Sequence, residues 1–117
     1  MTATPFTDAE YQRRASAALA QVESQVDRWL DDDVVDIDSH RTGGLLELAL
    51  PNGSKLIVNT QPPLHELWLA AKAGGFHFRL DASGRWLDTK DGVEFFQRLS
   101  DQASAQSGLR LVFAMPS

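Results

Sequence analysis

The chain has 117 residues, of which 43% are hydrophobic and none is cysteine, and its formal net charge is −5. This length predicts one domain, residues 1–117, around a single core. The lack of cysteine excludes disulfides, thiolate metal sites, a cysteine nucleophile and cysteine-ligated iron-sulfur clusters. The negative charge argues against a nucleic-acid partner. Because no signal-peptide pattern or apolar run of about 20 residues occurs, we expect a cytoplasmic protein without membrane contact.

The first predicted element is an acidic helix that runs to about Leu30. Thr7 and Glu10 have the spacing of a capping box. Apolar residues then recur every three or four positions as far as Trp29, which we expect in the core. Residues 1–40 carry nine acidic and three basic side chains, a net charge of −6, against seven acidic and eight basic side chains, or +1, in the remainder. The negative charge is therefore concentrated in the first third of the chain.

The end of this helix carries acids in unfavourable positions. Glu23 and Asp27 lie one turn apart, and Asp31 continues their line. Like charges at this spacing repel by about 0.2 to 0.5 kcal/mol, and acids near a helix carboxyl end oppose the macrodipole. We therefore expect Glu23 and Asp27 to destabilise the helix.

An edge strand is predicted at residues 34–39, with Val35 and Ile37 facing the core and Asp36 and Asp38 facing outward. Six acids then converge from the helix, the loop and the strand: Glu23, Asp27, Asp31, Asp32, Asp33 and Asp36. One interpretation is a solvated face that protects the strand edge from aggregation. The other is a set of hard oxygen ligands for a cation, which would bind weakly because the acids form no EF-hand and no defined cage.

The middle of the chain predicts a hairpin and a third strand. Asn52 and Gly53 are typical of a tight primed turn between strands at residues 45–50 and 55–59. Pro62 and Pro63 cannot donate ladder hydrogen bonds, so the chain must leave the sheet before re-entering it at residues 66–71. In that strand Leu67 and Leu69 face one way, whereas Trp68 faces the other way with charged neighbours.

The remaining elements complete an α+β fold. Strands are predicted at residues 76–81 and 85–88. A second helix follows, which begins at Asp91 and ends at Gly108. Residues 109–113 either add an edge strand or pack across the helices. Two helices flanking consecutive antiparallel strands predict a two-layer sandwich with both helices on one sheet face.

Trp68 is expected on the other, open sheet face. Its neighbours Leu67 and Leu69 occupy the buried side, so burying Trp68 as well would need a second cover. An exposed Trp among polar groups favours a protein-binding role over a core role. The residues expected around it on this face are Lys55, Asn59, Gln61, Lys72, His77 and Arg79.

Catalytic patterns are weak. The histidines at positions 40, 65 and 77 have no metal-ligand spacing, and the chain has no nucleophile elbow, P-loop or dinucleotide-binding pattern. His65 is interpreted as a turn-capping residue beside Pro63 rather than a base.

Three motifs in order carry a family resemblance: Asn52 to Lys55, then Asn59, Gln61, Pro63, Leu64, His65, Trp68, Leu69 and Ala70, then Gly74 to Phe78. Together with the acidic first helix, the strand at Trp86 and the second helix, they make nearly the whole chain similar to the frataxin family and, within it, to the bacterial CyaY branch. The resemblance implies a frataxin-like fold.

For function, the resemblance implies weak binding of ferrous and ferric iron through the first helix and first strand. The ligands carried over by position are Glu23, Asp27, Asp31, Asp32, Asp33, Asp36 and Asp38. At Ser24 and Arg28, where bacterial members often have further acids, this chain departs from the family. The resemblance also implies binding to a cysteine desulfurase and an iron-sulfur scaffold protein, with Asn59, Gln61 and Trp68 on the contacting face.

These implications favour a non-catalytic, iron-binding modulator of iron-sulfur cluster assembly. We expect a monomer, with iron-induced oligomers as a further expectation. One alternative is a ferroxidase or iron-storage enzyme. The other is an acidic adaptor that binds a basic partner without metal.

Overall fold

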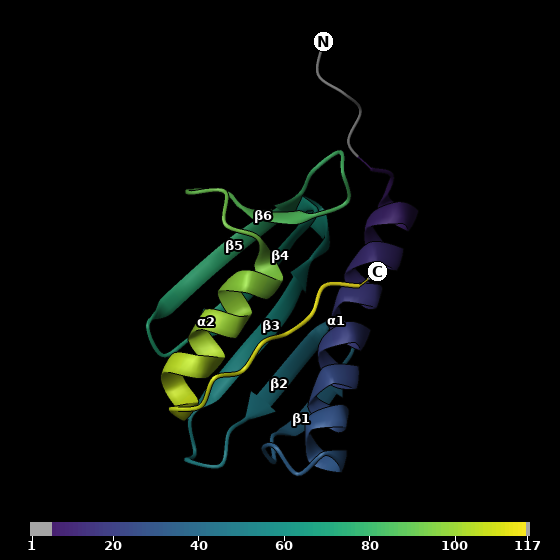
Figure 1. The fold of residues 1–117 in the computed structure, drawn as a ribbon. Helices are drawn as coiled ribbons and strands as arrows, with labels where there is room; N and C mark the ends of the chain where they lie inside the picture. The colour runs from purple at the N-terminus through teal and green to yellow at the C-terminus, as the bar shows by residue number, and fades with distance from the viewer. Residues whose placement is uncertain (1–5, 117) are drawn as a thin grey trace.

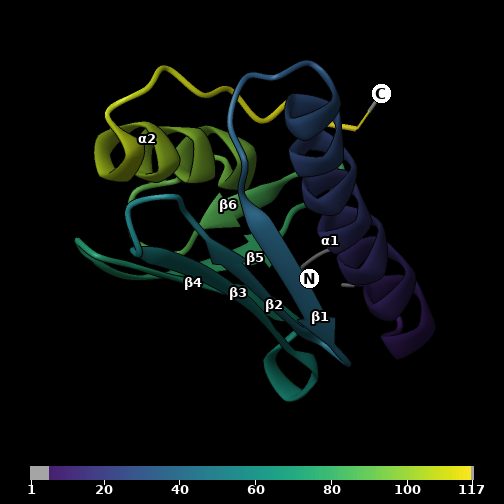
Figure 2. The same ribbon diagram turned by 90° about the horizontal axis from the view of Figure 1, so that it is seen from below.

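The computed structural model describes residues 6–116, so residues 1–5 and 117 of the predicted domain lie outside the described part of the chain. Two helices lie on one face of a six-stranded antiparallel sheet of order β1-β2-β3-β4-β5-β6 (Figure 1). Seen from below, both helices are on the same side of the sheet, which confirms the predicted two-layer α+β sandwich (Figure 2). The elements are α1 (Asp8–Asp31), β1 (Asp38–Thr42), β2 (Leu45–Ala49), β3 (Lys55–Gln61), the 3₁₀ turn η1 (Pro62–Leu64), β4 (Glu66–Ala71), β5 (Gly74–Leu80), β6 (Trp86–Asp88) and α2 (Phe95–Ser107).

Helix α1 begins as predicted. The Thr7 hydroxyl accepts the Glu10 N–H at 3.1 Å, and the Glu10 carboxylate accepts the Thr7 N–H, which completes the capping box. Its apolar stripe packs on the sheet, and Trp29 is 8% exposed, so the predicted core position of Trp29 is confirmed. In the described range 6–116, neither helix is long and apolar enough to span a bilayer.

The first strand begins later than predicted. Residues 34–37 are not in the ladder, and β1 starts at Asp38, which pairs with Ala49. The chain leaves α1 through Asp33, whose φ is +61°, while the Val34 N–H still donates to the Trp29 carbonyl at 2.8 Å. Those residues are therefore still crossing from the helix to the sheet edge. Val35 and Ile37 are buried as expected, but as part of that crossing.

The β2–β3 hairpin pairs the two predicted strands antiparallel, but through a different turn. Ala49 pairs with Lys55, whereas a two-residue turn at Asn52 and Gly53 would set Leu50 opposite Lys55. The Gly53 N–H donates to the Leu50 carbonyl at 2.9 Å, and only Gly53, not Asn52, has a positive φ. A type I′ turn needs positive φ at both central residues and a type II′ turn needs it at the first, so the prediction of a primed turn was wrong. The loop holds one more residue, and the Asn52 side chain accepts the Ser54 N–H at 3.0 Å instead.

Helix α2 starts at Phe95 rather than at Asp91. Glu94 is its N-cap, and its carboxylate accepts the N–H groups of Phe96 and Gln97 at 2.8 and 3.0 Å. Gly92 has a φ of +77°, which is incompatible with a helix at that point. Asp91 instead accepts the Val93 N–H at 3.0 Å in the preceding turn.

The C-terminal segment packs across the helices, which decides between the two predicted placements. In Figure 1 it runs between α2 and α1, and in the described part of the chain it joins no strand. Leu111 and Phe113 are 2% and 3% exposed, and the Phe113 ring lies 4.8 Å from that of Trp29. The hydroxyl oxygens of Ser104 and Ser100 accept the N–H groups of Leu111 and Phe113, respectively. Two α2 serines therefore replace a strand partner for this backbone.

Candidate functional site

The predicted iron ligands lie along one edge of the molecule, at the end of α1, in the crossing to β1 and at the start of β1. We call them the acidic surface: Glu23, Asp27, Asp31, Asp32, Asp33, Asp36 and Asp38. All but Glu23 are exposed. Within residues 6–116, no three His, Asp or Glu side chains come together closely enough to form a ready-made metal site. The acidic surface is thus a spread of water-facing carboxylates, a geometry suited to weak and poorly selective cation binding.

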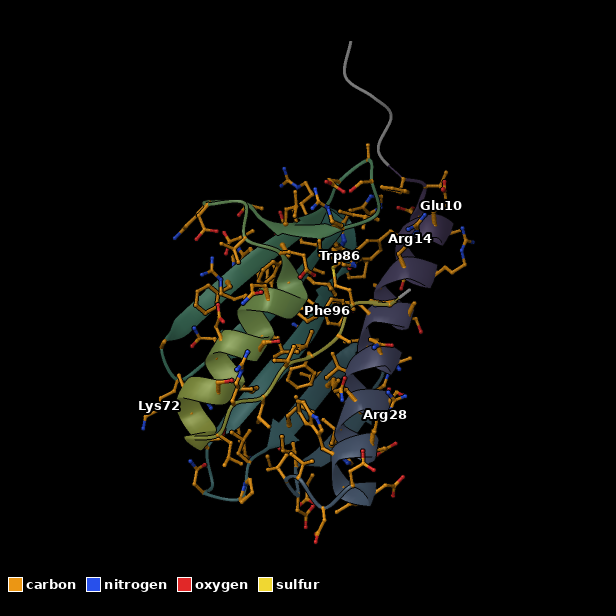
Figure 3. All side chains as sticks on the ribbon, viewed as in Figure 1. Glu10, Arg14, Arg28, Lys72, Trp86 and Phe96 are labelled. Atoms are coloured by element: carbon orange, nitrogen blue, oxygen red, sulfur yellow. The ribbon has the colours of Figure 1, made fainter. Side chains whose placement is uncertain are left out.

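Glu23 has a cationic partner that sequence reasoning missed. Arg41 on β1 places Nη1 2.8 Å from Glu23 Oε1, and its Nη2 donates to the Ser16 hydroxyl at 3.0 Å. This ion pair opposes the destabilisation expected of Glu23, whose net effect on stability stays a prediction. Its partner could not be identified because the direction of Arg41 depends on the register of β1, which begins later than predicted. Figure 3 labels Arg28, the basic residue in the last turn of the same helix.

The open sheet face carries a row of side chains that the strand register aligns. Asn59 on β3 pairs with Trp68 on β4, which pairs with His77 on β5. The alternate positions Leu67 and Leu69 are 0% and 1% exposed under the helices, so Trp68 faces away from the core as predicted. Gln61 lies further along β3 on the same face. Lys72 is in the turn after β4, next to the end of α2 (Figure 3).

Trp68 is half-buried and held from two sides rather than freely exposed. Its indole N–H donates to Glu66 Oε1 at 2.8 Å, and its ring stacks on His77 with centroids 4.1 Å apart and an interplanar angle of 7°. Glu66 is 5% exposed, and its other oxygen accepts Arg79 Nη2 at 2.7 Å. Strand alternation placed Trp68 among charged neighbours, which was the available signal, but did not identify the contact with Glu66. The orientation of the indole is therefore set by the fold.

Tyr11 joins α1 to the strands that carry this row. Its hydroxyl donates to the Glu66 carbonyl at 2.6 Å and accepts the Gln61 N–H at 3.0 Å. Burial raises the pKa of Tyr11, although the hydrogen bond from Gln61 opposes this, so the hydroxyl remains a donor at neutral pH. The ends of β3 and β4 are thus fixed around η1.

His65 is a turn residue, as predicted. It follows η1 with a φ of +53°, and its N–H donates to the Pro62 carbonyl at 3.1 Å. Its ring stacks on Tyr11 with centroids 4.8 Å apart, and its Nε2 lies 2.7 Å from Asp8 Oδ1. These contacts join the turn to the first residue of α1.

Comparison with known proteins identifies the family. The sequence model of the frataxin-like domain family matches residues 4–109. An iron-sulfur cluster assembly protein CyaY from Variovorax paradoxus (strain S110) is 53% identical over 109 residues, which cover 93% of this chain and 98% of that protein. The solved frataxin of Psychromonas ingrahamii, from the CyaY protein family, superposes with a TM-score of 0.81 at 32% identity and covers 94% of this chain and 100% of that one.

A more distant match shows the fold alone. Trimeric frataxin of the yeast Saccharomyces cerevisiae, solved in complex with ferrous iron, has a TM-score of 0.57 at 19% identity and covers 92% of this chain and 91% of that one. The family model spans most of the chain, the bacterial relative is similar over nearly its full length, and the fold agrees. The chain belongs to the frataxin family.

Proposed function

We propose that this chain is a non-catalytic, iron-binding regulator of iron-sulfur cluster assembly. The observation that carries the proposal is the presence of two separate surfaces of different chemistry in a member of the frataxin family. One is the acidic surface on the helix side and edge of the sheet, and the other is the Trp68 row on the open face. The curated relative from Variovorax paradoxus is named as an iron-sulfur cluster assembly protein, which supports the process.

Iron is the proposed cargo of the acidic surface. Carboxylate oxygens are hard ligands suited to iron, and the exposed acids of this surface let water complete the coordination. A yeast frataxin has been solved with ferrous iron, which supports the choice of metal. Because no three ligands converge in residues 6–116, we propose weak binding, with the carboxylates adapting to the ion.

The proposed partners are a cysteine desulfurase and an iron-sulfur scaffold protein. The acidic surface suits a basic region of the desulfurase, through long-range attraction that salt screens. The Trp68 row suits a closer, less polar contact, because a rigid aromatic side chain is a common interface anchor. The chain acts as a monomer that iron can assemble into oligomers, an extension supported by the trimeric yeast relative.

A reconstituted assay tests this function. The chain is titrated into purified desulfurase and scaffold, with and without added iron(II), while cluster formation is followed by absorbance. We expect the chain to change the rate of cluster formation, and to do so more strongly with iron. Partner binding that iron leaves unaffected would favour the metal-free adaptor, and iron-dependent oxygen consumption with turnover would favour the ferroxidase. An unchanged rate at every iron concentration would contradict the proposal.

The metal site has its own test. In an NMR titration with iron(II), the amide resonances of residues 23–38 should broaden first, while that of Trp68 remains sharp. The Asp31→Asn/Asp33→Asn variant should weaken this broadening, because it removes two exposed charges without disturbing a described contact of the fold. Strongest broadening at the histidines would reject the site.

A further inference from the structure

A hollow of about 200 Å³ opens on the open sheet face beside Trp68. Its walls include Leu45, Ile57, Trp68 and His77, and Ala70 and Gly75 lie in it as well. The strand register explains the shape. Across β4 and β5, the large residues Trp68 and His77 form one pair. The next pair on the same face consists of the small residues Ala70 and Gly75. The surface therefore drops sharply on one side of the Trp68 ring.

The hollow is apolar, no Asp, Glu, Lys or Arg of residues 6–116 lines it, and two ion pairs hold charged side chains elsewhere on the same sheet face. Glu47 pairs with Lys55 at 3.2 Å, and Glu66 pairs with Arg79 at 2.7 Å. An ionised side chain entering the hollow would therefore lose water without gaining an unpaired counter-charge, which is unfavourable. Complementarity of charge and polarity thus points to an uncharged, apolar occupant.

The size of the hollow further limits the kind of group that can occupy it. Pockets for small molecules are typically about 300 to 1,000 Å³, so this one is too small for most of them. Interface hot spots lie in well-packed pockets from which water is excluded, and one side chain inserted beside the Trp68 ring would form such a pocket. Among residues 6–116 the side-chain amide of Asn59, on the rim, has no hydrogen-bond partner and is free to bind the backbone that carries such a side chain.

We propose that this hollow receives one aliphatic side chain from an exposed segment of the protein partner that docks against Trp68. The inference rests on the proposed function, because it specifies what that partner presents. Gly75 and Ala70 then determine specificity by leaving the space open. A glycine inside a strand often marks a place where another molecule approaches closely.

Gly75 offers a direct test, because the fold does not require glycine there. Its φ is outside the left-handed region, and a Cβ at this position would come no closer than 4.0 Å to another heavy atom, the Leu69 carbonyl oxygen. A Cβ is therefore accommodated at this position without a clash, the methyl groups of Gly75→Val would occupy the hollow, and valine suits a strand better than glycine. The melting temperature should stay equal or rise, and the Trp68 indole resonance should keep its position.

Binding to the reconstituted desulfurase and scaffold complex is the readout. Gly75→Val should weaken it about tenfold or more, the factor expected when a hot-spot contact is blocked. Ala49→Val, which adds similar bulk to the same face three strands away, is the matched control and should bind like the unchanged chain. Trp68→Ala, measured in parallel, tests the docking face itself.

The outcomes separate the two proposals. If Trp68→Ala weakens binding and Gly75→Val does not, the hollow is not used, and this inference is overturned while the docking face stands. If neither variant weakens binding, the proposed partner-binding role of the open face is rejected, and this inference is rejected with it. If Gly75→Val and Ala49→Val weaken binding equally, the effect is one of general bulk, and the inference is likewise rejected.

Discussion

At the scale of single residues, Trp68 illustrates how a fold fixes the orientation of a surface aromatic. The Glu66 carboxylate fixes the edge of the indole and His77 covers one of its faces, so little rotamer freedom remains to be lost when a partner docks. Glu66 itself is buried on a face open to water, which is unusual for a charged residue unless it is paired. Its contacts with Trp68 and Arg79 account for that burial.

The role of Glu66 can be separated from its charge. Glu66→Ala removes the acceptor of the Trp68 indole N–H, so the hydrogen exchange of that proton should accelerate and the fold should lose about 1 kcal/mol or more. Glu66→Gln keeps an oxygen at the same place and should retain slow exchange. Glu47→Ala, on the same face but away from Trp68, is the control. Equal exchange rates in the Ala and Gln variants would show that Glu66 does not orient the indole.

The acids at the end of α1 should differ in their effect on stability. Asp27 lies one turn from both Glu23 and Asp31, so Asp27→Asn should raise the free energy of unfolding by about 0.3 to 1 kcal/mol at low salt. Glu23→Gln should bring no such gain, because it also breaks the ion pair with Arg41. Thermal melts at two salt concentrations check this. A larger gain for Glu23→Gln would mean that its pair with Arg41 is not formed in solution.

At the scale of elements, the sequence predicted the features that hydrophobic periodicity and helix-capping residues specify. The alternation around Leu67 and Leu69 placed β4 and the outward direction of Trp68, and the Thr7 and Glu10 spacing placed the start of α1. The start of α2 was missed because one local signal overrides another. Asp91 resembles a helix cap, but the positive φ of Gly92 delays α2 to Phe95.

The pairs within the site were harder to predict than the elements. The contact of Glu23 with Arg41 and the seating of Trp68 on His77 each depend on a register between strands. Such a register follows from the whole sheet rather than from residue spacing in one segment. The hollow at Gly75 also depends on this register, so it could not be predicted from residue spacing.

The C-terminal segment is held in place mainly by side chains of α2. Ser100 is buried in α2, and its hydroxyl donates to the Phe96 carbonyl while accepting the Phe113 N–H at 2.8 Å. Ser100→Ala would leave that N–H buried without an acceptor, so we expect a loss of about 1 to 3 kcal/mol. Denaturant unfolding measures it, with the exposed Ser24→Ala on α1 as control. Equal stability of the two variants would show that water replaces the serine.

At the scale of the whole molecule, the fold keeps the two proposed binding surfaces apart. The sheet separates the helix end that carries most of the acidic surface from the face that carries Trp68 (Figure 2). Charged surfaces act mainly on the rate of association and are screened by salt. A seated aromatic acts mainly on the rate of dissociation. Under the proposed function, the acidic surface would therefore attract the partner and the Trp68 row would retain it.

Surface plasmon resonance with immobilised desulfurase and scaffold complex, at low and high salt, tests this account most directly. Asp31→Asn/Asp33→Asn should slow association at low salt and differ little from the unchanged chain at high salt. Trp68→Ala should speed dissociation at both salt concentrations, at a cost of about 2 kcal/mol or more, while remaining folded. Identical salt dependence of the two variants, or unfolding of Trp68→Ala, would contradict the claim that the two surfaces act by different physics.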